Sequence, residues 1–411
     1  MLDTIIKKGN IVDYCFKLFF LVFVFGYSLI IKAESLKINQ NFSVSSGANK
    51  YNFSYVGGVR VIDGKFGSSR IGHTKGTFAV ADDGKSFWVT GHWGHFSIAR
   101  YSLKELSNGS SIDELPVARN LDPFVKICPD VSNENKPNIV TGIEYVDSKL
   151  FVNVAKAYDA AGKNQSTTMV FDEPLNLSRS NQYCYFSMEG KAHSAGWMSK
   201  IPSQYQDAFG AMYLTGYASN IPINSRLSIG PTLFTWFPYF ISPPKAMNET
   251  LSTTKLIDYS LAEPLMEDRY NKSGSNALWT ELSQAYYGQV MPQTGEYLIF
   301  GISGGHHSKI GYKITQNNGA VCPGPCAFDH KDYYNFFWFY NPLNSYDKRK
   351  PTSWGKFNLL KGDGEYAHLI GGADYSGGKM YFLVRNADTI QSKYEKMPVI
   401  LVYNVSIARH D

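Results

Sequence analysis

A motif of apolar and polar positions recurs along the chain. In each copy a short apolar run reaches a tight polar turn, and an aromatic-rich apolar run follows. Four copies are clear, at residues 78–89 (FAVADDGKSFWV), 143–153 (IEYVDSKLFVN), 290–301 (VMPQTGEYLIFG) and 373–384 (ADYSGGKMYFLV), and a looser copy with a longer turn runs over 197–216. Apolar runs of this length on both sides of a polar turn predict two antiparallel strands. Their repetition predicts that one supersecondary unit is used several times.

The spacing of the copies predicts the fold class. Their aromatic strands begin near residues 87, 150, 212, 297 and 380, and a further strand pattern follows each, at 96–103, 167–171, 232–236, 335–340 and 399–405. Long amphipathic helical patterns are nearly absent. Regular strands with Gly, Asp and Ser turns predict an all-β protein, and radial repetition of four-stranded sheets is the β-propeller. We therefore predict a five-bladed β-propeller.

Two alternatives to this architecture remain open. A six-bladed ring results if residues 51–63 (YNFSYVGGVRVID) begin a blade of their own. We expect instead that this segment pairs with the last blade and closes the ring, which hides a sheet edge. A pair of β-sandwiches needs a linker between them. The linker candidates, 242–248 and 345–353, do not divide the repeats cleanly.

The first residues of the chain carry an export pattern. Residues 18–31 (LFFLVFVFGYSLII) form an uncharged apolar run, and Lys7, Lys8 and Lys17 precede it. Such a run is short for a membrane span of about 20 residues. It predicts a signal peptide over 1–33 that is cleaved after Ala33, with an uncleaved signal anchor as the alternative. We expect a short segment over 34–50, a single propeller domain over 51–411, and a secreted, periplasmic or extracellular location.

The cysteines agree with export. Cys15 lies in the predicted leader, and four cysteines follow it. An even number in an oxidising compartment predicts disulfide bonds. Cys322 and Cys326 enclose Pro-Gly-Pro, which turns the chain back on itself, so we expect them to bond to each other, leaving Cys128 to pair with Cys184. The spacing of these cysteines does not match a zinc framework.

Composition limits the classes of partner. The chain of 411 residues is 44% hydrophobic and 15% aromatic, and its net charge of +5 is spread without a long basic run. Nucleic-acid binding requires clustered Lys and Arg, so no nucleic-acid partner is expected. No membrane contact is expected beyond the N-terminal anchor alternative. The sequence does not predict an oligomeric state.

Several phrases resemble a group of exported, mostly bacterial propeller proteins without an assigned function. The resemblance lies in residues 55–60 (YVGGVR), 76–92 (GTFAVADDGKSFWVTGH), 304–316 (GGHHSKIGYKITQ), 371–388 (GGADYSGGKMYFLVRNAD) and 398–405 (PVILVYNV). It implies the fold and export but carries no catalytic residues. More distantly, the five-fold count resembles the architecture of arabinanase- and invertase-type glycosidases. None of their catalytic motifs is present, so this likeness concerns architecture alone.

The histidines predict a binding face. In a propeller blade, whose strands are lettered A to D from the axis to the rim, the D–A and B–C loops emerge on the same face. Seven of the nine histidines fall in these loops: His73, His193 and His368 precede predicted A strands, and His92, His95, His306 and His307 follow predicted B strands. Histidine suits proton transfer, metal ligation or hydrogen bonding to a polar ligand.

Other residue types extend this face. Trp93 stands between Gly-His pairs in a predicted B–C loop, where packing demand is weak. Arg226 and Arg385 lie in the third and fifth B–C loops, and arginine is the natural partner of carboxylate, phosphate or sulfate groups. We predict that His73, His92, His193, His307 and Arg385 converge at one end of the axis, with Arg226 and Trp93 near the rim of that pocket. His306 is a further ligand-binding candidate.

The sequence supports catalytic residues less strongly than it supports a binding face. Glycoside cleavage normally uses two carboxyl groups, and the candidates are Glu144, Glu189, Glu281, Glu365 and Asp388. Glu144 is distinctive because it lies inside a predicted A strand, close to the axis. It and His307 are the catalytic candidates, although for Glu144 the sequence favours a structural role in hydrogen bonding to the neighbouring backbone.

Three functions are compatible with these observations. The first is an exported enzyme of the glycoside hydrolase or lyase kind that acts on a glycan. The second is a non-catalytic module that binds a carbohydrate or surface polymer. The third is a metal-dependent enzyme that uses the histidine cluster. No cofactor motif is evident, and a single axial metal ion belongs only to the third hypothesis.

Overall fold

The computed structural model describes residues 35–129, 136–159, 163–218, 228–238, 249–344, 348–361, 368–392 and 394–409. The predicted signal peptide, Arg226 and Glu365 lie outside these residues. Leu36–Asp411 form one compact unit. No helix among the described residues is long and apolar enough to cross a membrane.

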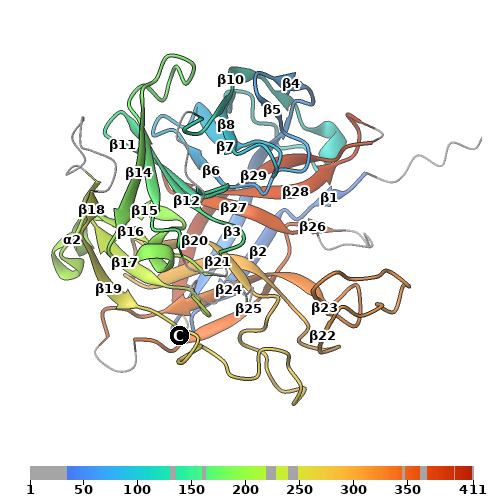
Figure 1. The fold of residues 1–411 in the computed structure, drawn as a ribbon. Helices are drawn as coiled ribbons and strands as arrows, with labels where there is room; N and C mark the ends of the chain where they lie inside the picture. Colours follow the sequence, from blue (N-terminus) through green and yellow to red (C-terminus); the bar gives the residue numbers. More distant parts are fainter. Residues whose placement is uncertain are drawn as a thin grey trace, which may run out of the picture. The chain divides into compact units, whose positions relative to one another are not determined.

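Five antiparallel sheets follow one another along the chain, as the repeats predict (Figure 1). Blade I contains β6 (Phe78–Val80), β7 (Ser86–Thr90), β8 (Ser97–Ser102) and β10 (Asn120–Lys126). Blade II contains β11 (Ile139–Val146), β12 (Lys149–Ala155), β13 (Thr168–Phe171) and β14 (Gln182–Met188), and β18 (Thr250–Leu251) adds a parallel pairing at its edge. Blade III contains β15 (Met198–Lys200), β16 (Tyr213–Thr215), β17 (Leu233–Trp236) and β19 (Thr253–Ile257). Blade IV contains β20 (Gln284–Val290), β21 (Tyr297–Gly304), β24 (Tyr333–Tyr340) and β25 (Ser353–Phe357).

Blade V is built from both ends of the domain. Its inner strands are β27 (Ile370–Ser376), β28 (Lys379–Asp388) and β29 (Met397–Arg409), and its outer strands are β3 (Asn49–Val61) and β2 (Asn41–Ser45). Strand β3 pairs antiparallel with β29 from Arg60↔Val399 to Asn49↔Arg409. In Figure 1 the blue strand β3 accordingly lies among the red strands. The segment over 51–63 therefore closes the ring, as expected, and the count is five blades.

The remaining elements are short. They are the strands β1 (Lys37–Ile38), β4 (Lys65–Phe66), β5 (Ser69–Arg70), β9 (Val117–Ala118), β22 (Ile310–Tyr312), β23 (Pro325–Ala327) and β26 (Leu360–Lys361), the 3₁₀ turns η1 (Ile112–Glu114) and η2 (Lys191–Ser194), and the helix α2 (Ser203–Phe209). The long turn of the looser third repeat is this helix. Its sequence, SQYQDAF, contains no Gly, Pro or β-branched residue, and Gly210 ends it in the left-handed conformation.

The innermost strands surround the axis. Strand β6 contacts β11 and β27, β15 contacts β11 and β20, and β20 contacts β27, which completes a ring of five. At the start of these strands the backbones approach closely. A Cβ atom on Gly142 would lie 1.9 Å from the Gly196 carbonyl oxygen, and one on Gly371 would lie 2.1 Å from that of Lys75. Glycine at these positions lets the inner strands pack backbone against backbone.

The core lies between the sheets and is rich in aromatic side chains. The aromatic strand β24 is buried from Asn335 to Tyr340. Between blades IV and V, the ring of Phe300 packs against those of Phe382 and Phe357 at centroid distances of 5.0 and 5.2 Å. Edge-to-face pairs of this kind add to the stabilisation from area burial.

Both predicted disulfides are present, and they fit an oxidising compartment such as the periplasm or cell exterior. Cys128 and Cys184 join the end of blade I to blade II with their Cα atoms 6.0 Å apart. The Cα atoms of Cys322 and Cys326 are 6.3 Å apart, at the strand pair β22–β23.

Candidate functional site

The predicted histidines of blade I lie together. The ring centroid of His92 is 5.8 Å from that of His73 and 4.7 Å from that of His95. Trp93 stacks beside His92 at 5.7 Å and is 60% exposed. His95 Nδ1 also lies 2.9 Å from the buried Ser69 hydroxyl, which positions its ring. This group forms an open aromatic and imidazole surface beside the start of β6.

His193 lies in a different cavity. The cavity has a volume of about 530 Å³ and is bordered by the loop before β15 and by β19. His193 Nδ1 is 2.5 Å from the Asp258 carboxylate. Burial acts to raise the pKa of Asp258, but the hydrogen bond and charge of His193 hold it below its usual range. The described contacts of His193 therefore join it to Asp258 and not to the histidines of blade I.

His306 and His307, adjacent in sequence, have different surroundings. His306 is buried, with Nε2 2.7 Å from the Ser303 hydroxyl and Nδ1 2.7 Å from the Asn276 carbonyl oxygen. Burial lowers the pKa of His306 and so favours its neutral form. His307 Nε2 lies 3.0 Å from the Lys356 amine. The first imidazole therefore has structural hydrogen bonds, and the second is accessible to solvent.

The full convergence of the five predicted residues stays a prediction. The structure brings His73 and His92 together, while His193 and His307 have the partners described above. Arg385, in β28, lies with its guanidinium carbon 5.7 Å from the centroid of the Tyr286 ring.

The inner strands also line an axial cavity of about 520 Å³, at the ends where they turn into the second strands. Its polar and aromatic lining comes from all five blades: Asp82, Glu144, Tyr145, Asp147, Lys200, Ser203, Gln206, Tyr213, Gln289, Asp374 and Tyr375. Helix α2 supplies Ser203 and Gln206. This cavity lies at the opposite ends of the inner strands from the histidine surface, because β6 begins beside the latter and its last residue, Val80, lines the cavity.

Glu144 and Asp374 occupy equivalent positions of the repeat. Glu144 pairs with Phe151 across the blade II hairpin, and Asp374 pairs with Tyr381 across the blade V hairpin. Each acid lies five residues before the lysine that begins the second strand. In blade I, between these two, the equivalent residue is Val80, which pairs with Phe87. The repeat thus places two carboxyl groups at the same level on either side of one blade.

Burial controls the charge of this pair. Burial raises the pKa of Glu144 well above its ordinary value, the neighbouring charges of Asp374 and Asp82 raise it further, and Lys200 opposes them. Burial also raises the pKa of Asp374, to about 6, against hydrogen bonds from the Val80 and Tyr375 amides and from Tyr287. The Val80 bond to Asp374 Oδ2 is 2.6 Å long. Burial and the charges of its neighbours therefore favour the protonated form of Glu144, whereas a pKa of about 6 leaves Asp374 mostly ionised at neutral pH.

Sequence reasoning identified Glu144 but missed its partner. Aligning the repeats on their turn lysines, Lys149 and Lys379, would have matched Glu144 to Asp374. Lys200, also missed, has no such signal because the third repeat is irregular. Within the described residues, no group of three or more His, Cys, Asp or Glu side chains could hold a metal ion.

Comparisons with known proteins add little. No protein-family model matches the chain, and no curated protein matches it in sequence. Similar solved structures include a candidate glycosidase from Bacteroides thetaiotaomicron (10% identity, 90% of this chain and 97% of that chain, TM-score 0.39). Another is a glycosyl hydrolase from Bacteroides ovatus (10% identity, 92% of this chain and 92% of that chain, TM-score 0.38). A third is a candidate oxidoreductase (glucose dehydrogenase) from Thermus thermophilus (10% identity, 83% of this chain and 98% of that chain, TM-score 0.35). At these scores the fold assignment rests on the strand pairing of the chain itself.

Proposed function

We propose that this protein binds a glycan in the axial cavity and cleaves a glycosidic bond there, with Glu144 as the proton donor and Asp374 as the ionised partner. The observation that carries this proposal is that two carboxyl groups from equivalent repeat positions line one cavity. Glycoside hydrolysis normally requires such a pair, one carboxyl to protonate the leaving oxygen and one to act as base or nucleophile.

The electrostatics of the cavity support these roles. A general acid must be protonated at the working pH, and burial together with the charges of Asp374 and Asp82 favours the neutral form of Glu144. Asp374, with a pKa of about 6, is mostly ionised at neutral pH. The rings of Tyr145 and Tyr375 at the cavity wall suit the apolar faces of sugar rings.

A second candidate function is glycan binding without cleavage. The observation that favours it is the hydrogen bond from the Val80 amide to Asp374, which joins the inner strands of blades I and V. An aspartate with this structural role is held in place whether or not it takes part in a reaction. The two functions share the cavity and differ in whether its carboxyl groups react.

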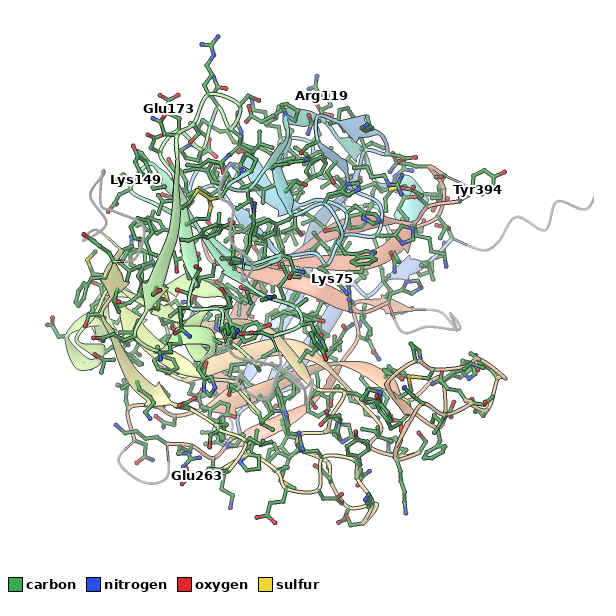
Figure 2. All side chains as sticks on the ribbon, in the orientation of Figure 1. Lys75, Arg119, Lys149, Glu173, Glu263 and Tyr394 are labelled. Carbon is green, nitrogen blue, oxygen red and sulfur yellow. A yellow bond between two sulfur atoms is a disulfide. The ribbon has the colours of Figure 1, made fainter. Side chains whose placement is uncertain are left out.

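A hydrolysis screen tests the proposal. The purified protein is incubated with neutral, acidic and amino polysaccharides, and new reducing ends are measured. Glu144→Gln and Asp374→Asn should each lower the rate of hydrolysis by roughly a hundredfold or more. The control variant is Glu173→Gln, which changes an exposed carboxylate at the edge of the molecule in Figure 2 and should leave the rate of hydrolysis unchanged. Glycan binding without product, weakened by substitutions in the cavity, would support the second function. Product formation that survives both substitutions would refute the catalytic assignment.

A further inference from the structure

The cavity that contains His193 is separate from the axial cavity. Its volume is about 530 Å³, close to the 520 Å³ of the axial cavity, and the two share no lining residue. Lys200, the last residue of β15, lines the axial cavity, whereas His193 precedes the first residue of β15 and lines the other. The proposed hydrolysis therefore leaves a second cavity of the same size without a role.

A carboxylate holds the imidazole that borders this cavity. His193 Nδ1 lies 2.5 Å from Asp258 Oδ1, and the Lys255 amine lies 3.8 Å from the other oxygen of Asp258. The pKa of Asp258 is below its usual range despite burial, so its carboxylate accepts the bond and His193 Nδ1 carries the hydrogen. A carboxylate bonded to one ring nitrogen fixes the orientation of the ring and leaves the other nitrogen for a ligand.

The second nitrogen of His193 is accessible from the cavity. Within the described ranges, no residue forms a hydrogen bond to His193 Nε2. The side chain is 18% exposed, and Nε2 is not one of the buried polar atoms that lack a partner, so a molecule in the cavity can reach it. Nε2 accepts a hydrogen bond in the neutral imidazole and donates one in the protonated imidazole. A hydroxyl group fits both states, because it can donate and accept.

The charges around the cavity favour a neutral ligand. Besides His193, the ionisable side chains in its lining are Asp159, Glu189, Asp258, Lys191 and Lys255. Acids and bases are nearly equal in number, so neither an anion nor a cation is strongly favoured. Glu189 Oε2 is held by the Ser252 hydroxyl at 2.9 Å and the Thr253 amide at 3.0 Å. Fixed acceptors beside lysine donors suit a ligand with several hydroxyl groups, such as a sugar.

The backbone at the edge of the cavity is strained. Lys191, the first residue of η2, has a φ of 48°, a left-handed conformation that is uncommon for residues other than glycine. Such conformations persist where the surrounding structure enforces them, and they cluster at ligand sites. Here the strained turn brings Lys191 and His193 to the border of one cavity.

We propose that this cavity binds a neutral sugar unit, with His193 Nε2 hydrogen-bonded to a hydroxyl group of the sugar and Asp258 positioning the imidazole. The site goes beyond the proposed hydrolysis, because it uses neither Glu144 nor Asp374. It provides a second place for a glycan, at the other end of β15 from the axial cavity.

Two substitutions of one histidine test the role of Nε2. The purified protein is titrated with D-glucose, D-galactose, D-mannose, D-xylose and L-arabinose, and binding is measured by saturation-transfer NMR. His193→Asn keeps an amide nitrogen near the position of Nδ1, which can donate to Asp258, but removes the group at Nε2. It should weaken the binding of at least one sugar by roughly threefold to tenfold, the effect of one lost hydrogen bond. His193→Gln, whose amide reaches the position of Nε2, should retain more of the binding.

The matched control is the same substitution outside the cavity. His330 Nδ1 also bonds to a side chain, the Asn317 amide oxygen at 2.8 Å, and His330 does not line the cavity. His330→Asn should therefore leave sugar binding unchanged.

Variants of Asp258 separate positioning from a purely structural role. Asp258→Asn keeps an oxygen that accepts from His193 Nδ1, whereas Asp258→Ala removes it. Sugar binding should weaken in Asp258→Ala and recover at least in part in Asp258→Asn. Thermal unfolding of all four variants shows whether the losses of binding follow the losses of stability, which would assign the pair a structural role and contradict the proposal.

The same titrations distinguish this proposal from the proposed hydrolysis. Binding that depends on His193 in a protein without hydrolytic activity supports the second site and not the proposed function. Binding weakened by Glu144→Gln but not by His193→Asn assigns the sugar to the axial cavity and overturns the second site. The proposal is also overturned if none of the five sugars binds.

Discussion

The two disulfides enclose loops of very different length, and this difference predicts unequal contributions to stability. Cys128 and Cys184 are 56 residues apart, whereas Cys322 and Cys326 are 4 apart. A disulfide constrains the unfolded chain more strongly when it closes a longer loop. The chain-entropy relation gives about 4 kcal/mol for the first loop and about 2 kcal/mol for the second. Replacing both cysteines of a pair with alanine should lower the free energy of unfolding by these amounts.

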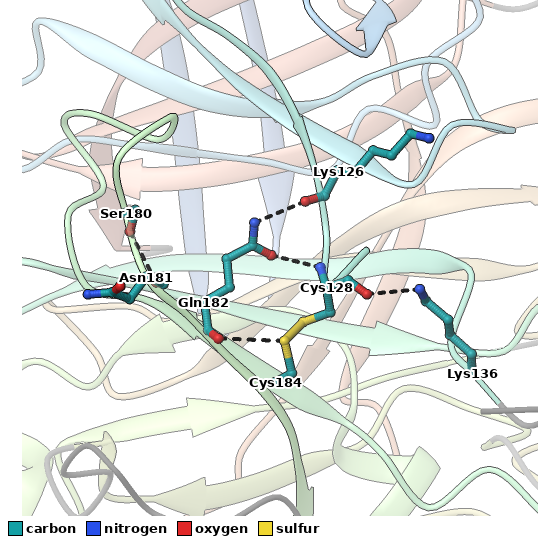
Figure 3. The surroundings of a disulfide bond; sticks show 7 residues. All are labelled: Lys126, Cys128, Lys136, Ser180, Asn181, Gln182 and Cys184. Atoms are coloured by element: carbon teal, nitrogen blue, oxygen red, sulfur yellow. Dashed lines mark hydrogen bonds between the residues drawn. A yellow bond between two sulfur atoms is a disulfide. The ribbon is translucent and has the colours of Figure 1, made fainter. Parts of the chain in front are cut away.

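The native contacts around the longer loop support this assignment. The Gln182 side chain accepts from the Cys128 amide at 2.7 Å and donates to the Lys126 carbonyl oxygen at 3.0 Å (Figure 3). The Lys136 amine donates to the Cys128 carbonyl oxygen at 2.8 Å. These bonds keep the two segments together without the covalent link, so the loss in Cys128→Ala/Cys184→Ala should arise mainly in the unfolded state.

The assay is urea unfolding followed by tryptophan fluorescence under non-reducing conditions. Both alanine pairs remove the same atoms, so each serves as the control for the other. The longer-loop variant should lose roughly twice as much stability as the shorter-loop variant. Equal losses, or a larger loss for Cys322→Ala/Cys326→Ala, would refute the chain-entropy reasoning.

Three further results are expected. Burial raises the pKa of Asp374 from 3.8 to about 6, so the folded state binds the proton of this carboxyl group more tightly than the unfolded state does. The stabilisation from this proton is fully present below pH 3.8 and is lost as the pH rises through about 6. In denaturant titrations between pH 4 and 7, Asp374→Asn should therefore remove up to about 3 kcal/mol of the fall in unfolding free energy. Gly142→Ala should lower the thermal unfolding midpoint measured by calorimetry, since its methyl group would meet the Gly196 carbonyl oxygen at 1.9 Å; a midpoint equal to that of the parent protein would contradict this packing. Phe382→Ala should cost about 3 to 5 kcal/mol in urea unfolding because the side chain is fully buried among aromatic rings, and a loss below about 1 kcal/mol would show that the blade IV–V core relaxes around the cavity.

Local patterns made most of the fold predictable. The turn between the two inner strands of a blade depends on residues that are adjacent in the sequence, as in residues 143–153. Likewise, Pro-Gly-Pro forms the turn that brings Cys322 and Cys326 together. Helix α2 was not predicted because a single short helix inside a strand repeat carries little periodic signal.

The candidate sites were less predictable because they depend on contacts between distant parts of the chain. The histidine count directed attention to the D–A and B–C loops, whereas Glu144 and Asp374 line one cavity at the opposite ends of the inner strands. The close approach of Gly371 to the Lys75 carbonyl oxygen likewise requires the ring to be closed and the inner strands of blades I and V to touch. No local sequence pattern encodes that proximity.

The pairing of β3 with β29 has a consequence for biosynthesis. Strand β3 is among the first parts of the domain to be made, and its partner β29 is the last. During translation one edge of β3 therefore has backbone N–H and C=O groups without hydrogen-bond partners, and such an edge can pair with a strand of another chain. A premature stop codon before Met397 would leave β3 permanently without this partner, so a lesion in the codons for β29 would expose a strand that is encoded far upstream.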